Sequence, residues 1–172
     1  GSLPQVATES IHHLVRHAQR LGWRGFLTRH WPIGDLDPVA AYLARASWDR
    51  SVTPASAYLD HFTRVYGAPA AGAMGQAMRL LEDATLILDL DFLSLYFPVL
   101  GIMVPSLEAD APMPEGLFHV RALYEEARRL LVRVEVQVAS SAGRAELAYW
   151  QSRLEFAVQA LVEKELLHEG GM

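Results

Sequence analysis

Helical periodicity is the feature that most constrains the fold of this chain. Apolar residues recur every three or four positions along most of its length, which places them on one face of successive helices. The pattern is longest near the C-terminal end, over residues 115–139 and 142–168, and it is continuous over residues 69–88. We therefore predict a mainly α-helical bundle of about five to six helices.

Start and stop signals divide the first half of the chain into shorter helices. A helix over residues 7–21 has Thr8 or Ser10 available as its N-terminal cap and a glycine directly after it. The pairs Asp-Pro and Thr-Pro open the helices predicted over residues 37–47 and 53–67, because proline at the first helical position loses no hydrogen bond. Four prolines further along the chain predict one long loop over residues 98–114.

One short stretch interrupts the helical pattern. Residues 25–31 alternate in character, are rich in aromatic and β-branched side chains and follow two glycines, so they predict at most one short β-strand. An aromatic ring can stack on the apolar face of a sugar, and Arg, His and Asp side chains can hydrogen-bond its hydroxyls. The carbohydrate-binding residues that we predict are Arg29, His30, Trp31 and Asp35.

A purely structural role for the same residues stays open, since large aromatic side chains are as common in protein cores as in binding sites. In that case Trp31 would cover the core and Arg29 would pair with an acidic residue. We predict no catalytic residue, no metal ligand and no cofactor in this chain. His13 and His17 could face the same side of a helix, but two ligands do not make a metal site. For Glu155 we expect an ion pair with Arg153 or with an arginine of a neighbouring helix.

Composition excludes several classes of partner. The chain has 15 Lys and Arg against 20 Asp and Glu, a net charge of −5, so nucleic acid is not an expected partner. The absence of cysteine excludes disulfides and thiolate chemistry. The most apolar segment, residues 86–104, contains Asp89 and Asp91, whose burial in lipid is costly, so we expect no membrane association. We expect a soluble protein; the compartment stays open, with the cytoplasm favoured.

The run "SIHHLVRHAQRLGWRGFLTRHWPIGDLDPVAAYLARASWD" resembles the closing helix and final strand of a barrel-type glycoside hydrolase. The segments "TPASAYLDHFTRVYG" and "YWQSRLEFAVQAL" are similar to the helical C-terminal region that follows the barrel in α-glucuronidase-like and hexosaminidase-like enzymes. The resemblance implies a C-terminal helical domain or fragment of a carbohydrate-active protein. Such a domain would contribute part of the substrate wall and packing surface without complete catalytic machinery, because catalytic carboxylates of these families lie on earlier strands.

This interpretation gives a single helical domain over residues 3–172, in which residues 3–36 are a remnant of the unit that closes the barrel and residues 37–172 form the bundle. Gly1 and Ser2 are interpreted as an expression scar. The expected partner is an upstream barrel domain or a second copy of the chain, together with a carbohydrate ligand.

Two other functions are compatible with the sequence. Hydrophobic residues make up 51% of the chain, which gives more apolar surface than a lone small domain needs. Such an excess is typical of a stand-alone helical interaction or self-association module. A helical bundle with an internal apolar ligand cavity is the third interpretation, and its predicted lining is Met74, Met78, Phe92 and Tyr96.

Overall fold

The fold is described from a computed structural model, over residues 3–25, 27, 37–91 and 115–169. This part of the chain contains α-helices, one short 3-10 helix and no strand, which confirms the mainly α-helical prediction. The elements are α1 (Thr8–Arg20), α2 (Asp37–Ala46), α3 (Pro54–Tyr66), α4 (Ala68–Asp91), α6 (Glu115–Val134), the 3-10 helix η3 (Glu135–Gln137) and α7 (Ser141–Glu169).

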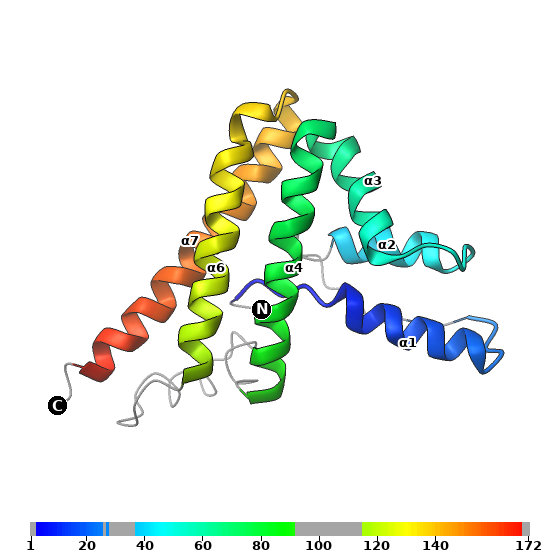
Figure 1. Ribbon diagram of the computed structural model, residues 1–172, viewed down its shortest axis with the longest axis horizontal. Helices are drawn as coiled ribbons and strands as arrows, with labels where there is room; N and C mark the ends of the chain where they lie inside the picture. Colours follow the sequence, from blue (N-terminus) through cyan, green and yellow to red (C-terminus); the bar gives the residue numbers. More distant parts are fainter. Residues whose placement is uncertain (1–2, 26, 28–36, 92–114, 170–172) are drawn as a thin grey trace.

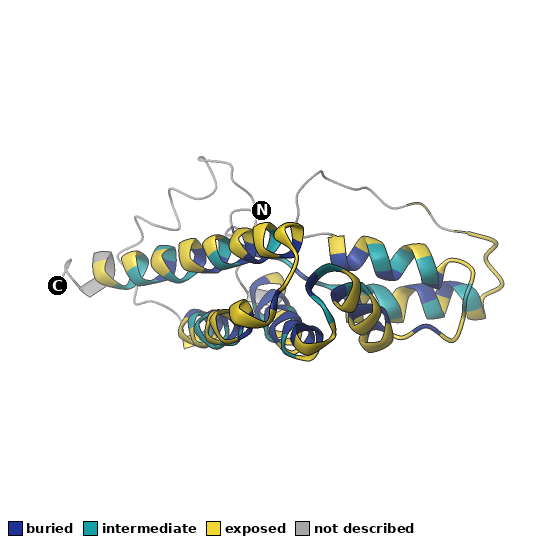
Figure 2. Ribbon diagram, turned by 90° about the horizontal axis from the view of Figure 1, so that it is seen from above, coloured by how far each residue is buried: buried dark blue, intermediate teal, exposed yellow. Residues whose placement is uncertain are grey.

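The helices form a body and an arm. The body consists of the three longest helices, α4, α6 and α7, and the arm consists of α1 and α2, which project to one side (Figure 1). α3 connects the two parts, since it packs against α2 and against α4. Seen from above, the helices of the body turn their buried faces toward one another and their exposed faces outward (Figure 2).

Small residues let the body helices pack closely. α4 presents alanines at seven-residue intervals, Ala70, Ala77 and Ala84, all fully buried, and it packs against both α3 and α6. Trp150 of α7 and Tyr124 of α6 are also fully buried in this core. A smaller second core holds the arm together and consists of Val15, Tyr42, Ala46, Val52 and Ala57.

The N-terminal segment, residues 3–7, belongs to the core of the body. Leu3 and Val6 are buried there, although the segment precedes the first helix. The Val6 N–H donates to Thr85 Oγ1 of α4 over 3.0 Å, and the Tyr124 hydroxyl of α6 donates to the Pro4 carbonyl over 3.2 Å. Side chains of two helices therefore satisfy the backbone of this segment.

Capping of α3 agrees with the sequence, and capping of α1 does not. Thr53 caps α3, with Pro54 in its first turn and Ser56 completing a reciprocal pair of hydrogen bonds. The N-cap residue of α1 is Ala7, which has no capping side chain, so the expected cap by Thr8 or Ser10 is wrong. The physical reason is that a distant carboxylate on α4 performs this role.

Two predicted features lie outside the described residues in whole or in part. Arg24, Gly25 and Leu27 are not in a strand, and the rest of the predicted strand is not described. The loop predicted over residues 98–114 falls entirely in the part of the chain that is not described. Among the helices of the described ranges, none is both long and apolar enough to span a bilayer.

Candidate functional site

The carbohydrate-binding residues predicted from the sequence, Arg29, His30, Trp31 and Asp35, all lie outside the described residues. Their role therefore stays a prediction. Met74 and Met78, predicted to line an apolar cavity, are fully buried in the main core and pack there with other apolar side chains. The remaining two cavity residues, Phe92 and Tyr96, are also outside the described part of the chain.

A cleft of about 330 Å³ lies between α1 and the turn that joins α2 to α3, and we call it the arm cleft. Its lining residues are Arg16, Gln19, Arg20 and Arg50. The first three lie within one turn and a half of α1, at spacings that place them on neighbouring positions of one helix face. Arg50 belongs to the turn, so that arginines from two separate elements line this cleft.

Hydrogen bonds to the backbone fix the geometry of the arm cleft. The Gln19 side-chain amide donates to the Ala46 carbonyl at the end of α2 over 3.0 Å. Arg16 donates from Nη1 to the carbonyl of Arg50, and also to Gln19 Oε1 over 3.2 Å. Two side chains of α1 therefore hold the end of α2 and the following turn in place.

The arginines of the arm cleft form no ion pair with a carboxylate in the part of the chain that the structure describes. In the described ranges, no Asp or Glu oxygen lies within ion-pair distance of Arg16, Arg20 or Arg50. Arg45 of α2, in contrast, pairs with Asp60 at 3.0 Å. The cleft is thus a positively charged site on a protein whose net charge is −5.

The carboxylate closest in sequence to Arg50 is engaged elsewhere. Asp49 Oδ1 accepts hydrogen bonds from the backbone N–H and the hydroxyl of Ser51, at 2.8 and 2.7 Å. These two bonds hold the pKa of Asp49 below its ordinary value. Asp49 therefore shapes the turn that presents Arg50 instead of neutralising the guanidinium.

Two exposed tryptophans lie at the same end of the arm. Trp23 follows α1 and is 61% exposed, and its backbone N–H donates to the Ala18 carbonyl. Trp48 follows α2 and is 75% exposed, and its N–H donates to the Arg45 carbonyl. Since the Gln19–Ala46 hydrogen bond joins the ends of these two helices, the segments that carry both tryptophans follow helix ends that lie together.

A partly buried histidine–tyrosine contact joins α1 to α2. His12 Nδ1 and the Tyr42 hydroxyl are 2.7 Å apart, and their rings meet edge to face. Burial lowers the pKa of His12 and raises the pKa of Tyr42, so both groups are neutral at neutral pH. The contact keeps the lining residues of α1 in position against α2.

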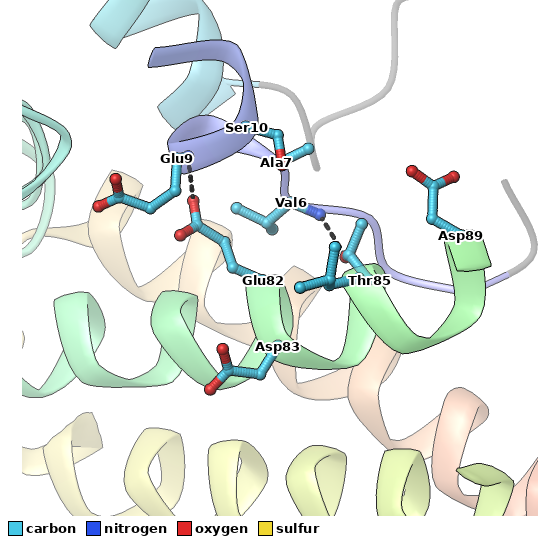
Figure 3. A pocket seen from close by; sticks show the side chains of 9 residues that line it. Val6, Ala7, Glu9, Ser10, Glu82, Asp83, Thr85 and Asp89 are labelled. Carbon is cyan, nitrogen blue, oxygen red and sulfur yellow. Dashed lines mark hydrogen bonds between the residues drawn. The ribbon is translucent and has the colours of Figure 1, made fainter. Parts of the chain in front are cut away.

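A second polar cluster joins α1, α3 and α4, and Figure 3 shows its contact between Glu82 of α4 and the start of α1. Glu82 Oε1 accepts hydrogen bonds from the Tyr58 hydroxyl at 2.6 Å and from the backbone N–H groups of Thr8 and Glu9 at 2.9 and 3.3 Å. The Thr8 hydroxyl lies 2.5 Å from the Tyr58 hydroxyl and donates to it, which leaves the Tyr58 proton for Glu82. Glu82 is thus the cap of α1, supplied from 74 residues away.

Burial raises the pKa of Glu82, and the hydrogen bonds that it accepts counteract this only in part. Burial raises the pKa of Tyr58 as well, with the Glu82 charge adding to the effect. Because the Tyr58 hydroxyl and the N–H groups of Thr8 and Glu9 all donate to Glu82 Oε1, we interpret this cluster as structural.

A third polar cluster lies between α3 and α7. The Tyr66 hydroxyl donates to Glu146 Oε1 over 3.0 Å, and burial raises the pKa of Tyr66. His61 Nε2 and Trp150 Nε1 are buried and have no hydrogen-bond partner among the described residues. Burial also lowers the pKa of His61, although the Glu146 carboxylate acts in the opposite direction. None of these residues lines the arm cleft, and none lines the smaller pocket beside Glu82.

The side chains considered for metal binding and ion pairing are exposed. His13 and His17 lie on the solvent side of α1, and among the described residues no group of three metal-binding side chains occurs. Glu155 pairs with Arg128 of α6 at 3.9 Å, which confirms the expected ion pair with a neighbouring helix.

The sequence did not identify the arm cleft, although one signal was present. The thirteen residues of α1 include two arginines and three histidines against a single carboxylate, Glu9. Two tryptophans follow the predicted ends of the first two helices, at Trp23 and Trp48. Comparison with protein-family models, with curated proteins and with solved structures finds no match to this chain.

Proposed function

We propose that this chain is the helical domain of a carbohydrate-active, glycoside hydrolase-like protein, and that it binds sugar at the end of the arm. The domain contributes binding and packing surface and does not carry the catalytic machinery. The observation that supports this proposal is the exposure of two tryptophans, Trp23 and Trp48, which follow α1 and α2 at the end of the arm that also carries the arm cleft.

The chemistry of the arm surface suits a sugar. Indole faces cover the C–H groups of a pyranose ring, and the exposed area of both tryptophans is costly unless a ligand covers it. Arginine side chains of the arm cleft can donate hydrogen bonds to ring and hydroxyl oxygens. The residues predicted from the sequence, Arg29, His30, Trp31 and Asp35, belong to the stretch between Leu27 and α2, which adds donors, acceptors and an indole from the same part of the chain.

Replacing either indole tests the proposal. We expect Trp23→Ala and Trp48→Ala each to weaken oligosaccharide binding on the order of tenfold, the equivalent of about 1.4 kcal/mol of lost stacking. The measurement is calorimetric titration with neutral, uronic-acid and amino-sugar oligosaccharides, supported by tryptophan fluorescence.

Phe156→Ala is the control, because Phe156 is an aromatic residue of α7 that is 52% exposed and far from the arm in the chain. It should bind as the unaltered protein does. Equal affinity of both tryptophan variants and the unaltered protein would remove the indoles from any sugar site, and an absence of binding to every sugar would contradict the proposal.

Self-association is the second candidate function. Tyr149 and Phe156 are seven residues apart on α7, which places both partly exposed rings on one side of the helix. A second copy of the chain could cover this side. We expect sedimentation to show a dimer whose fraction rises with concentration, and Phe156→Glu to shift the equilibrium to monomer because it places a charge in the contact. A monomer at every concentration would exclude this function.

A further inference from the structure

Three arginines line the arm cleft without an ion-pair partner among the described residues. Arg16, Arg20 and Arg50 line one cleft of about 330 Å³, and no carboxylate of the described ranges is within ion-pair distance of them. Like charges in a shared cleft repel one another, at a cost that grows as water is excluded. An anion bound between them would convert this repulsion into attraction.

We infer that the arm cleft binds the phosphate group of a small phosphorylated molecule. Three positive charges from two elements match a dianion better than a monoanion such as a simple carboxylate. The guanidinium group is planar and donates in pairs, a geometry that suits phosphate oxygens. A cleft of about 330 Å³ accommodates a small molecule, and the protein's net charge of −5 opposes binding of a nucleic acid.

The hydrogen bonds around Arg16 prepare the cleft for such a ligand. Both acceptors of Arg16, the Arg50 carbonyl and Gln19 Oε1, use the same nitrogen, Nη1. No described residue accepts a hydrogen bond from Nε or Nη2, and the guanidinium is already held in place, so little side-chain entropy is lost on binding. Arg20, one turn further along α1, and Arg50 on the turn can then contact the phosphate from two sides.

The position of the tryptophans indicates what the phosphate is attached to. Trp23 and Trp48 are exposed in the segments that follow α1 and α2, at the end of the arm that carries the arm cleft, and a ring carried by the phosphate could stack on one of them. A sugar phosphate fits both features. This part of the inference rests on the proposed function, whereas recognition of the phosphate itself rests only on the arginines.

The experiment compares four probes by calorimetric titration at constant ionic strength: inorganic phosphate, glucose 6-phosphate, glucose and acetate. We expect inorganic phosphate to bind, glucose 6-phosphate to bind more tightly, and acetate to bind on the order of tenfold more weakly than phosphate. Arg20→Ala and Arg50→Ala should each weaken phosphate binding on the order of tenfold, and Arg20→Lys should restore part of it because the charge returns without the paired donors.

Arg79→Ala is the matched control, because Arg79 is an exposed arginine of α4 that does not line the cleft. It should leave phosphate binding unchanged. An Arg79→Ala variant that loses as much phosphate affinity as Arg20→Ala and Arg50→Ala would overturn the inference. Equal binding of acetate and phosphate would overturn it as well. If glucose and glucose 6-phosphate bind equally well, phosphate contributes nothing, which overturns this inference and leaves the proposed function intact. If inorganic phosphate and glucose 6-phosphate bind equally well, the sugar contributes nothing, which supports phosphate recognition and counts against the proposed function.

Discussion

Replacement of Glu82 by alanine is expected to lower the free energy of unfolding by about 3 kcal/mol, because it removes a helix cap and a charged hydrogen-bond acceptor together. The Tyr58 hydroxyl is buried and would lose the acceptor to which it donates at 2.6 Å. The N–H groups of Thr8 and Glu9 would lose theirs at the start of α1, where Ala7 offers no substitute. Denaturant unfolding measures the loss, and the melting temperature should fall by roughly 6–12 °C.

Asp83→Ala is the control for this experiment. Asp83 is the next residue on α4, is exposed, and turns its carboxylate away from the first turn of α1 (Figure 3). We expect its replacement to leave stability unchanged within experimental error. Equal stability of the Glu82→Ala variant and the unaltered protein would show that Glu82 does not cap α1.

The same carboxylate gives stability a pH dependence of defined sign. Burial raises the pKa of Glu82 in the folded protein above the ordinary value of 4.5, so the folded state binds the proton more tightly than the unfolded state does. Its contribution to stability therefore increases as the pH falls through the folded pKa toward 4.5, and is lost as the pH rises. The side chain at this position cannot titrate in Glu82→Gln. We therefore expect the free energy of unfolding of the unaltered protein, relative to that of this variant, to increase as the pH is lowered.

Replacement of Gly143 by alanine is expected to destabilise the protein by about 2–3 kcal/mol, although alanine is the better helix former. Gly143 lies in the first turn of α7 and is buried against the end of α3. A Cβ atom there would lie 2.5 Å from the Val65 carbonyl oxygen, a backbone atom that cannot move aside without moving α3. Thermal unfolding measures the effect. We expect a lower melting temperature, a transition that stays cooperative, and unchanged helical circular dichroism at low temperature.

Gly72→Ala is the matched control, with an expected effect of opposite sign. Gly72 is exposed in the second turn of α4, and a Cβ atom there would meet no atom within 4 Å. The substitution should stabilise the protein by about 0.5–1 kcal/mol, the ordinary gain of alanine over glycine in a helix. A stabilising effect at both positions would mean that α7 does not approach the end of α3 as closely as described.

The helices could be predicted from the sequence because their signals are local. The repeat of apolar side chains and the Thr53-Pro54 start signal depend only on residues a few positions apart. The cap of α1 failed as a prediction for the converse reason. Thr8 and Ser10 are adequate caps by residue type, but the acceptor that α1 uses is Glu82, and nothing local links these positions.

The candidate site shows the same division. The sequence directed attention to Arg29, His30, Trp31 and Asp35, where aromatic and polar residues are adjacent in the chain and which lie outside the described residues. The arm cleft instead combines α1 with Arg50, and only the hydrogen bonds from Gln19 to Ala46 and from Arg16 to Arg50 bring them together.

The sequence by itself determined the helical class of this protein, the approximate ends of its helices and the faces that they bury, because each of these follows from interactions within one or two helical turns. The tertiary structure decided which groups lie together without being close in the chain. It placed Glu82 at the start of α1 and Arg50 beside Arg16. It thereby determined both the contact between α4 and α1 and the positively charged arm cleft. Such pairings depend on how whole helices pack, since burial and charge compensation are satisfied in space and not along the sequence.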